Sequence, residues 1–207
     1  MRVAFLSGGK DSYYAVYRYG LGVDLGLMLV YDFPRPSPHL VNLGKSVETI
    51  LLTGIPILVV KLSKGRELVE TVSILRKLNA DTIVAGDVYI EDHLRYMEKV
   101  AGEAGATLVE PLWGLDPGEL LYKELEDGVR PLIIGCVNKL SSWLGVELNL
   151  GNVEQFTATL RTQNIDPLGE RGEYHTLVLT GPLHREPLKY EITHIIDYED
   201  YKILRLL

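Results

Sequence analysis

Short apolar runs alternate with amphipathic segments through the first two-thirds of this 207-residue chain. Residues 25–30 are nearly all apolar, which is typical of a strand buried on both faces. Leu68, Val72 and Leu75 recur at the spacing of one helical face. The pattern predicts strands at 2–6, 25–30, 57–62, 82–85 and 107–109, and helices at 12–19, 44–52, 67–78 and 91–104. This alternation favours the α/β class, with an open, parallel, five-stranded, Rossmann-like sheet and right-handed crossovers.

The pattern changes after about residue 128. Further strands are predicted at 130–137, 174–179, 189–196 and 202–206, with a short helix at 152–162. No long linker separates the two parts of the sequence. We therefore expect a first domain of residues 1–128 packed against a small C-terminal α+β lobe of residues 129–207.

The composition is that of a soluble globular protein, with 46% hydrophobic and 24% charged residues. No apolar run reaches the roughly 18 residues that a membrane span needs, and the N-terminal residues do not resemble a signal peptide. Cys136 is the single cysteine, which excludes an internal disulfide and indicates a buried core thiol. We expect a reduced, cytoplasmic protein that does not associate with membranes.

The chain carries a formal net charge of −7. A broad nucleic-acid-binding face normally needs a basic surface, because most of the affinity comes from phosphate contacts. The acidic balance therefore disfavours RNA as the main partner.

The first predicted strand runs directly into the segment Ser7-Gly8-Gly9-Lys10-Asp11-Ser12. A strand, two glycines and a helix start form an anion-binding corner, where backbone N–H groups and the helix dipole converge. The glycines allow a ligand to approach the backbone closely, and Lys10 adds a movable cation. Asp11 could hold a divalent metal that bridges phosphate oxygens, and Ser12 could cap the helix or bind a phosphate. The alternative is a plain glycine turn.

Walker A loops have a different spacing, with Gly, four residues and then Gly-Lys-Ser/Thr, so that motif is excluded here. In open parallel sheets, ligands lie beyond the carboxyl ends of the strands, where the winding direction switches. Gly86 and Asp87 follow the strand at 82–85 and are expected across the same crevice. For Asp87, simple capping of the next helix is the alternative interpretation.

A second group of polar residues precedes the predicted strand at 174–179. Glu170, Glu173, His175 and Thr176 lie there between and after two glycines. A pair of carboxylates can orient an amine or a metal, and a histidine can transfer protons near neutral pH. Glycine and glutamate are also common in solvated turns, so the local signal alone is modest.

Ser-Gly-Gly-x-Asp-Ser at the end of a first strand resembles the pyrophosphate loop of the N-type ATP pyrophosphatases, which have an adenine nucleotide alpha-hydrolase-like fold. The resemblance extends to the diphthine–ammonia ligase family. It rests there on Gly-Glu-x-Gly-Glu-Tyr from residue 169, followed by Thr176 and Gly181-Pro182. Further matches over nearly the whole chain are Pro38-His39, Gly54-Ile55-Pro56 and Pro111-Leu112-Trp113.

The resemblance implies an amide ligase that uses ATP, Mg²⁺ and ammonia, forms an acyl-adenylate, and releases AMP and pyrophosphate. Its substrate would be the carboxylate of diphthine, a modified histidine on elongation factor 2. It implies an ATP-binding domain at 1–128 and a substrate lobe at 129–207. The implied catalytic residues are Lys10, Asp11, Glu173 and His175, with Asp11 as metal ligand. The implied nucleotide-binding residues are Ser7, Gly8, Gly9, Lys10, Asp11, Ser12, His39, Gly86 and Asp87. The candidate substrate-binding residues are Glu98, Glu170, Glu173 and Thr176, together with Glu91 and His93 of the segment that follows the fourth strand. For His93, an exposed position on the helix is the alternative interpretation.

The chain departs from the family's pattern in two places. Where the best-known ligases have Gly-Ala-Ile/Leu and then Tyr-Gln-Arg, this chain has Gly86-Asp87 and later His93-Leu94. Where they have Glu-Thr, it has His175-Thr176. One alternative is therefore a related ATP pyrophosphatase with a different carboxylate or a tRNA substrate. Another is a non-enzymatic nucleotide-binding sensor. The sequence leaves self-association into a homo-oligomer open.

Other candidate residues have simpler interpretations. His184 and His194 are predicted to be ordinary surface residues, and Trp113 to be a core residue. The tyrosines of the first helix, such as Tyr13 and Tyr14, are predicted to pack with hydrated hydroxyls.

Overall fold

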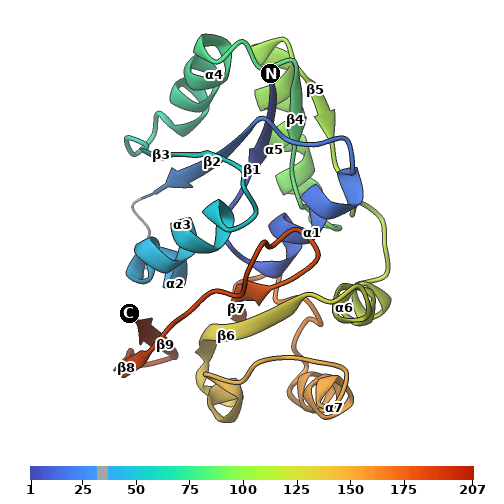
Figure 1. Ribbon diagram of the computed structural model, residues 1–207, viewed down its shortest axis with the longest axis vertical. Coiled ribbons are helices and arrows are strands. Elements are labelled where there is room, and N and C mark those ends of the chain that lie inside the picture. The colour runs from blue at the N-terminus through green and yellow to red at the C-terminus, as the bar shows by residue number, and fades with distance from the viewer. Residues whose placement is uncertain (32–36) are drawn as a thin grey trace.

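The computed structural model describes residues 1–31 and 37–207. Its first sheet has five parallel strands in the order β3-β2-β1-β4-β5, which confirms the predicted α/β class (Figure 1). The strands are β1 (Arg2–Phe5), β2 (Leu25–Val30), β3 (Ile57–Lys61), β4 (Thr82–Val84) and β5 (Thr107–Val109). The chain winds outward from β1 to β3 on one side and continues through β4 and β5 on the other. The winding direction therefore switches between β1 and β4, where a ligand is expected.

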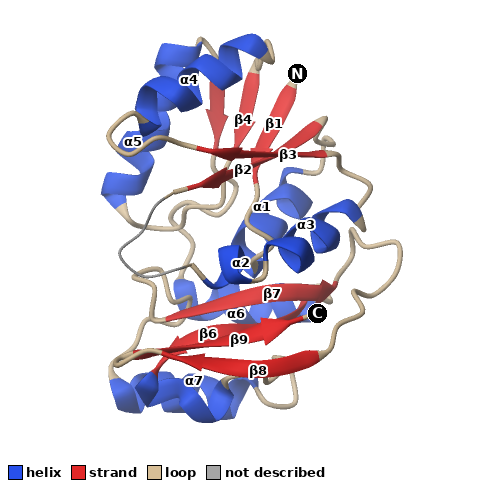
Figure 2. Cartoon of the chain, turned by 90° about the vertical axis from the view of Figure 1, so that its left-hand side faces the viewer, coloured by secondary structure: helices blue, strands red, loops and turns tan. Residues whose placement is uncertain are grey.

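Helices cover both faces of this sheet (Figure 2). They are α1 (Lys10–Tyr19), α2 (Pro38–Val41), α3 (Leu43–Leu51), α4 (Glu67–Lys77) and α5 (Glu91–Ala104). On one face, Leu75 of α4 and Met97 of α5 pack against strand residues such as Ile83. On the other face, Val16 of α1 and Ile50 of α3 join a second cluster. The predicted helices are confirmed within two residues at their ends, and α2 is an addition.

The C-terminal lobe has an antiparallel sheet in the order β7-β6-β9-β8, as expected for an α+β lobe. Its strands are β6 (Arg130–Val137), β7 (Tyr174–Thr180), β8 (Ile192–Asp197) and β9 (Tyr201–Leu206). Its helices are α6 (Pro117–Glu126), the 3-10 helix η1 (Asn138–Trp143) and α7 (Val153–Gln163). Cys136 is fully buried in β6, as predicted.

Helix α6 has no counterpart among the helices predicted from the sequence. Its N-terminus carries a clear signal, because the Asp116 side chain caps it by accepting from the Glu119 backbone N–H, and Pro117 occupies the first turn. Leu121 and Leu125 of α6 pack in one core cluster with Phe156 of α7. We therefore propose a domain boundary before α6 rather than at residue 128.

The two parts of the molecule are joined at α1 and α3. Val178 of β7 donates a backbone hydrogen bond to the Gly8 carbonyl at 2.9 Å. His184 was predicted to be an ordinary surface residue, and this is wrong. Its Nδ1 lies 3.1 Å from the Tyr13 hydroxyl and its Nε2 lies 2.9 Å from Thr49 Oγ1, so the ring fills the junction. Burial lowers the pKa of His184 to about 4. His194 is exposed, as predicted.

Over the described ranges, the helices are too short or too polar for any of them to cross a lipid bilayer.

Candidate active site

A cleft of about 510 Å³ opens at the carboxyl ends of β1 and β4. The lining residues come from the loop that precedes α1, the loop that follows β4 together with α5, the turn that precedes β7, and residues in and next to β2 and α2. The polar residues that line it are Ser7, Asp11, Ser12, Tyr31, Ser37, His39, Asp87, His93, Glu170, Tyr174, His175 and Thr176. Apolar side chains, among them Leu29 and Met97, also line it. The cleft therefore occupies the switch point of the sheet and receives residues from both parts of the molecule.

A larger hollow of about 650 Å³ lies between α6 and α7, with Arg18, Tyr122 and Arg161 among its lining residues. Within the described part of the chain, none of the site residues predicted from the sequence lines this hollow. The smaller cleft carries the candidate chemistry.

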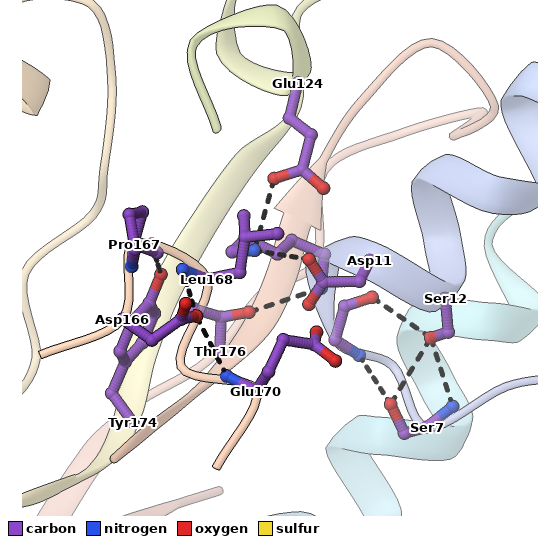
Figure 3. A network of polar contacts seen from close by, with 12 residues as sticks. Ser7, Asp11, Ser12, Glu124, Asp166, Pro167, Leu168, Glu170, Tyr174 and Thr176 are labelled. Atoms are coloured by element: carbon purple, nitrogen blue, oxygen red, sulfur yellow. Dashed lines mark hydrogen bonds and ion pairs between the residues drawn. The ribbon is translucent and has the colours of Figure 1, made fainter. Parts of the chain in front are cut away.

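The loop before α1 is held by its own hydroxyl groups (Figure 3). The Ser7 backbone N–H donates to Ser12 Oγ at 3.3 Å, and Ser12 Oγ donates to the Gly9 carbonyl at 3.2 Å. The Gly9 N–H donates to Ser7 Oγ at 3.2 Å. These contacts fix the loop in an open curve at the start of α1, so the positive end of the helix dipole points into the cleft.

Gly8 has a different role from the one expected. Its φ of +89° is in the region that favours glycine, but the space for a Cβ faces away from the cleft. A Cβ there would lie 3.1 Å from Thr49 Cγ2 and 3.2 Å from the Ser46 carbonyl oxygen. Gly8 therefore serves the packing of the loop on α3 and β7, whereas Gly9 lines the cleft.

Lys10 also differs from its expectation as a movable cation. Only 1% of its side chain is exposed, and its Nζ lies 2.5 Å from Asp11 Oδ1 and 3.4 Å from Glu124 Oε2. Burial alone would lower the pKa of Lys10, but the two carboxylates outweigh it and keep that pKa well above its ordinary value. The ammonium is thus fixed behind the loop rather than free in the cleft.

The loop after β4 lies directly against α1. A Cβ on Gly86 would lie 2.9 Å from the Asp11 carbonyl oxygen, so this contact requires glycine. Asp87 Oδ1 lies 3.3 Å from His93 Nδ1, a contact that raises the pKa of His93. The Asp87 N–H donates to Glu110 Oε2 at 3.2 Å. Burial, followed by the Asp87 charge, raises the pKa of Glu110 to about 8.

Asp166 organises the turn that carries Glu170. Its Oδ1 accepts from the backbone N–H groups of Leu168 at 2.9 Å and Glu170 at 3.2 Å. Its Oδ2 accepts from the Tyr89 hydroxyl at 2.6 Å, which ties the turn to the loop after β4. Burial, reinforced by the Asp11 charge, raises the pKa of Glu170 to about 7. Glu170 therefore titrates near neutrality at the mouth of the cleft.

His39 and His175 meet edge to face, with ring centroids 5.7 Å apart, and both line the cleft. Burial and the neighbouring His175 lower the pKa of His39 to about 3, so His39 is neutral at pH 7. Thr176 Oγ1 accepts from the Lys10 backbone N–H at 3.2 Å. Thr176 therefore fixes the first turn of α1 from the second lobe.

Three residues proposed for the substrate lie outside this cleft. Glu173 instead borders an acidic hollow with Glu199 and Asp200, and its Oε2 accepts from the Arg171 N–H at 3.1 Å. Glu173 lies just before β7, where its backbone carbonyl accepts from the Val137 N–H of β6 at 2.9 Å, and its side chain borders the hollow beside that strand end. Glu91 is exposed and paired with Arg95, and Glu98 lies on the exposed face of α5. We assign these three residues no role in the cleft.

Several residues that shape the site were not predicted from the sequence. Tyr174 is buried, and its hydroxyl donates to the Pro167 carbonyl at 2.6 Å. Glu124 is fully buried beside Lys10; burial raises its pKa, and the charge of that lysine acts against the rise. The available signal was a glutamate on the apolar face of α6, next to Leu120 and Leu121, but α6 itself was not predicted.

The described residues contain no cluster of three or more His, Cys, Asp or Glu side chains able to hold a metal on their own. Mg²⁺ is commonly bound by one or two carboxylates together with substrate phosphates. Asp11 is 25% exposed and lines the cleft at the start of α1. It therefore fits a magnesium ion that arrives with a polyphosphate.

Residues 1–108 match the model of the diphthamide synthase N-terminal domain, and residues 116–204 match that of the diphthamide synthase C-terminal domain. No curated protein matches the chain in sequence. A solved structure from Methanocaldococcus jannaschii, described as a "predicted subunit of tRNA methyltransferase", is 15% identical and has a TM-score of 0.44. That alignment covers 88% of this chain and 97% of the other, and it carries no functional argument. The two family matches confirm the resemblance seen in the sequence, and the chain belongs to the diphthamide synthase family.

Proposed function

We propose that this protein is a diphthine–ammonia ligase: an ATP-dependent enzyme that forms AMP, pyrophosphate and an amide through an acyl-adenylate. Family membership supports a ligase-like enzyme. The observation that carries the finer proposal is the meeting, in one cleft, of the loop before α1 with the turn of the C-terminal lobe that holds Glu170. A reaction between two substrates needs both of them held in a single site.

The nucleotide end of the cleft is assigned to the loop before α1. Ser7, Gly9 and Ser12 line it where the dipole of α1 favours negative charge. Asp11 would hold Mg²⁺, which when bound would neutralise the charge of the departing pyrophosphate. Gly86 lets the opposite wall approach α1 closely. Fixed charges and dipoles of this kind supply a large part of catalysis in most such sites.

The acyl end is assigned to the residues of the C-terminal turn and the loop after β4. Asp87 and Glu170 carry negative charge into the cleft, which favours a positively charged group such as the ammonium ion. Because its pKa is raised to about 7, Glu170 can accept a proton near neutral pH as ammonium becomes the nucleophile ammonia. His175 and Thr176 complete this wall.

The direct test uses purified elongation factor 2 that bears diphthine, together with Mg²⁺-ATP and ammonium. We expect AMP, pyrophosphate and the mass change of a carboxylate converted into an amide. Elongation factor 2 that already carries the amide is the matched control and should support no turnover. ATP binding without AMP formation on the diphthine-bearing protein would refute this assignment.

One observation favours a second candidate, a ligase of this family that acts on a different carboxylate. Asp87 and His93, which belong to the segment that departs from the family's pattern, both line the cleft. An arginine in that segment could hold a substrate carboxylate with two hydrogen bonds, whereas aspartate and histidine cannot. Efficient amidation of diphthine would exclude this candidate. ATP cleavage that depends on another carboxylate would favour it.

A further inference from the structure

A buried ion cluster lies behind the loop before α1 (Figure 3). Lys10 faces two carboxylates, at 2.5 Å from Asp11 Oδ1 and 3.4 Å from Glu124 Oε2. Tyr174, also buried, lies close enough to interact with this cluster. One cation therefore has two possible counter-ions, which come from different parts of the chain.

The two carboxylates differ in their freedom. Asp11 is 25% exposed and lines the cleft, so it can turn toward a ligand. Glu124 has no exposed surface, and the buried leucines beside it on α6 pack in the core of the C-terminal lobe. Among the described residues, neither oxygen of Glu124 has a hydrogen-bond partner with good geometry. Glu124 can therefore still accept a hydrogen bond from Lys10, and it does not do so while Asp11 is paired with Lys10.

A buried ammonium that loses its counter-ion is strongly destabilised. If Glu124 were absent, an Asp11 carboxylate that turned into the cleft would leave the buried Lys10 ammonium without a counter-ion. Asp11 would then remain on Lys10 and be a poor ligand for any metal. With Glu124 in place, the lysine keeps one partner after Asp11 has turned away.

We propose that Glu124 is a positioning residue that retains Lys10 and so releases Asp11 to hold the magnesium ion that arrives with ATP. This inference rests on the proposed function, because it takes the loop before α1 to be the nucleotide site. It adds a role for α6, which contributes no residue to the lining of the cleft among the described residues.

The test measures how much Mg²⁺ strengthens the binding of α,β-methylene-ATP, which resists cleavage between the α- and β-phosphates. Isothermal titration calorimetry gives the dissociation constant with Mg²⁺ and with EDTA, and their ratio is the metal-dependent gain. Glu124→Gln should reduce this gain about tenfold, a typical coupling between charges in contact. It should leave binding in EDTA nearly unchanged. Glu126→Gln, an exposed change on the same helix, is the matched control and should preserve the gain.

Two further variants separate positioning from a loss of structure. Glu124→Asp keeps the charge and should recover part of the gain that Glu124→Gln loses. In a Lys10→Met background no lysine needs a partner, so adding Glu124→Gln should have no further effect on the gain. Melting temperatures identify any variant that does not fold. If Glu124→Gln does not fold, the comparison of Glu124→Asp with Glu126→Gln decides: an unchanged gain in Glu124→Asp overturns the inference.

The outcomes distinguish the two proposals. If wild-type protein shows the gain and folded Glu124→Gln keeps all of it, Glu124 does not position Lys10. An equal loss of binding with and without metal in Glu124→Gln would also overturn the inference, since it indicates a structural role. Wild-type protein without any metal-dependent gain would refute both the magnesium role of Asp11 and the inference built on it.

Discussion

The hydrogen bond from Tyr89 to Asp166 makes a quantitative prediction, because it joins the loop after β4 to the turn that carries Glu170. Tyr89→Phe removes a single donor at 2.6 Å and keeps the ring in place. A hydrogen bond to a charged group contributes about 1.5–3 kcal/mol. Because Tyr89 is only half-buried and Asp166 keeps its two backbone donors, we expect a loss of about 2 kcal/mol in the free energy of unfolding.

For a chain of this size, that loss corresponds to a fall of roughly 4–8 °C in the melting temperature. The assays are urea unfolding and turnover with the acyl substrate. We expect turnover to fall as the turn loosens, while ATP affinity stays the same. Tyr14→Phe is the matched control, because it removes a similar hydrogen bond from tyrosine to aspartate, at 2.7 Å, outside the cleft. Tyr14→Phe should lower the free energy of unfolding by a similar amount but leave turnover nearly unchanged. Equal losses of turnover in both variants, or wild-type stability in Tyr89→Phe, would refute the reasoning.

Three further predictions follow from the cleft. Asp11→Ala should fold normally and lose on the order of 3 kcal/mol of transition-state stabilisation, which is about a hundredfold in the rate of AMP formation. Turnover at the wild-type rate would contradict the role of Asp11. Glu170→Gln should depress turnover, whereas Glu173→Gln should not, because Glu173 lies outside the cleft; the reverse order in steady-state kinetics would contradict our placement of the substrate. Burial raises the pKa of Glu110 from 4.5 to about 8, so the folded state binds a proton that the unfolded state releases. Stability from this group is present below about pH 4.5 and is lost as pH rises toward 8; Glu110→Gln should flatten that decline in urea unfolding, and an unchanged pH profile would refute it.

The sheet and most of the helices could be predicted because they depend on local periodicity. Residues 25–30, for example, have the continuous apolar run of a buried parallel strand, and the structure contains this strand with the same bounds. The loop before α1 could be located for the same reason, since it follows the first such run directly.

The orientation of individual side chains in the site could not be predicted. The burial of Lys10 depends on Glu124, which is distant in sequence and lies in a helix that was not expected. The position of Glu173 outside the cleft depends on the pairing of its backbone with Val137 of β6, a contact between segments that are distant in sequence. The lack of space for a Cβ at Gly8 is caused by α3, and no local sequence pattern reveals how α3 packs against the loop.

The backbone hydrogen bond from β7 to the Gly8 carbonyl affects how this protein can be divided or recombined. Residues 1–108 contain the whole glycine loop, yet they lack Thr176, Val178 and Glu124, which fix its backbone and its lysine. If the six-residue loop were grafted onto another parallel sheet, it would lack the contacts that fix its backbone conformation and its lysine. Chimaeras between members of the family should therefore exchange the loop together with β7 and α6, as one inherited unit.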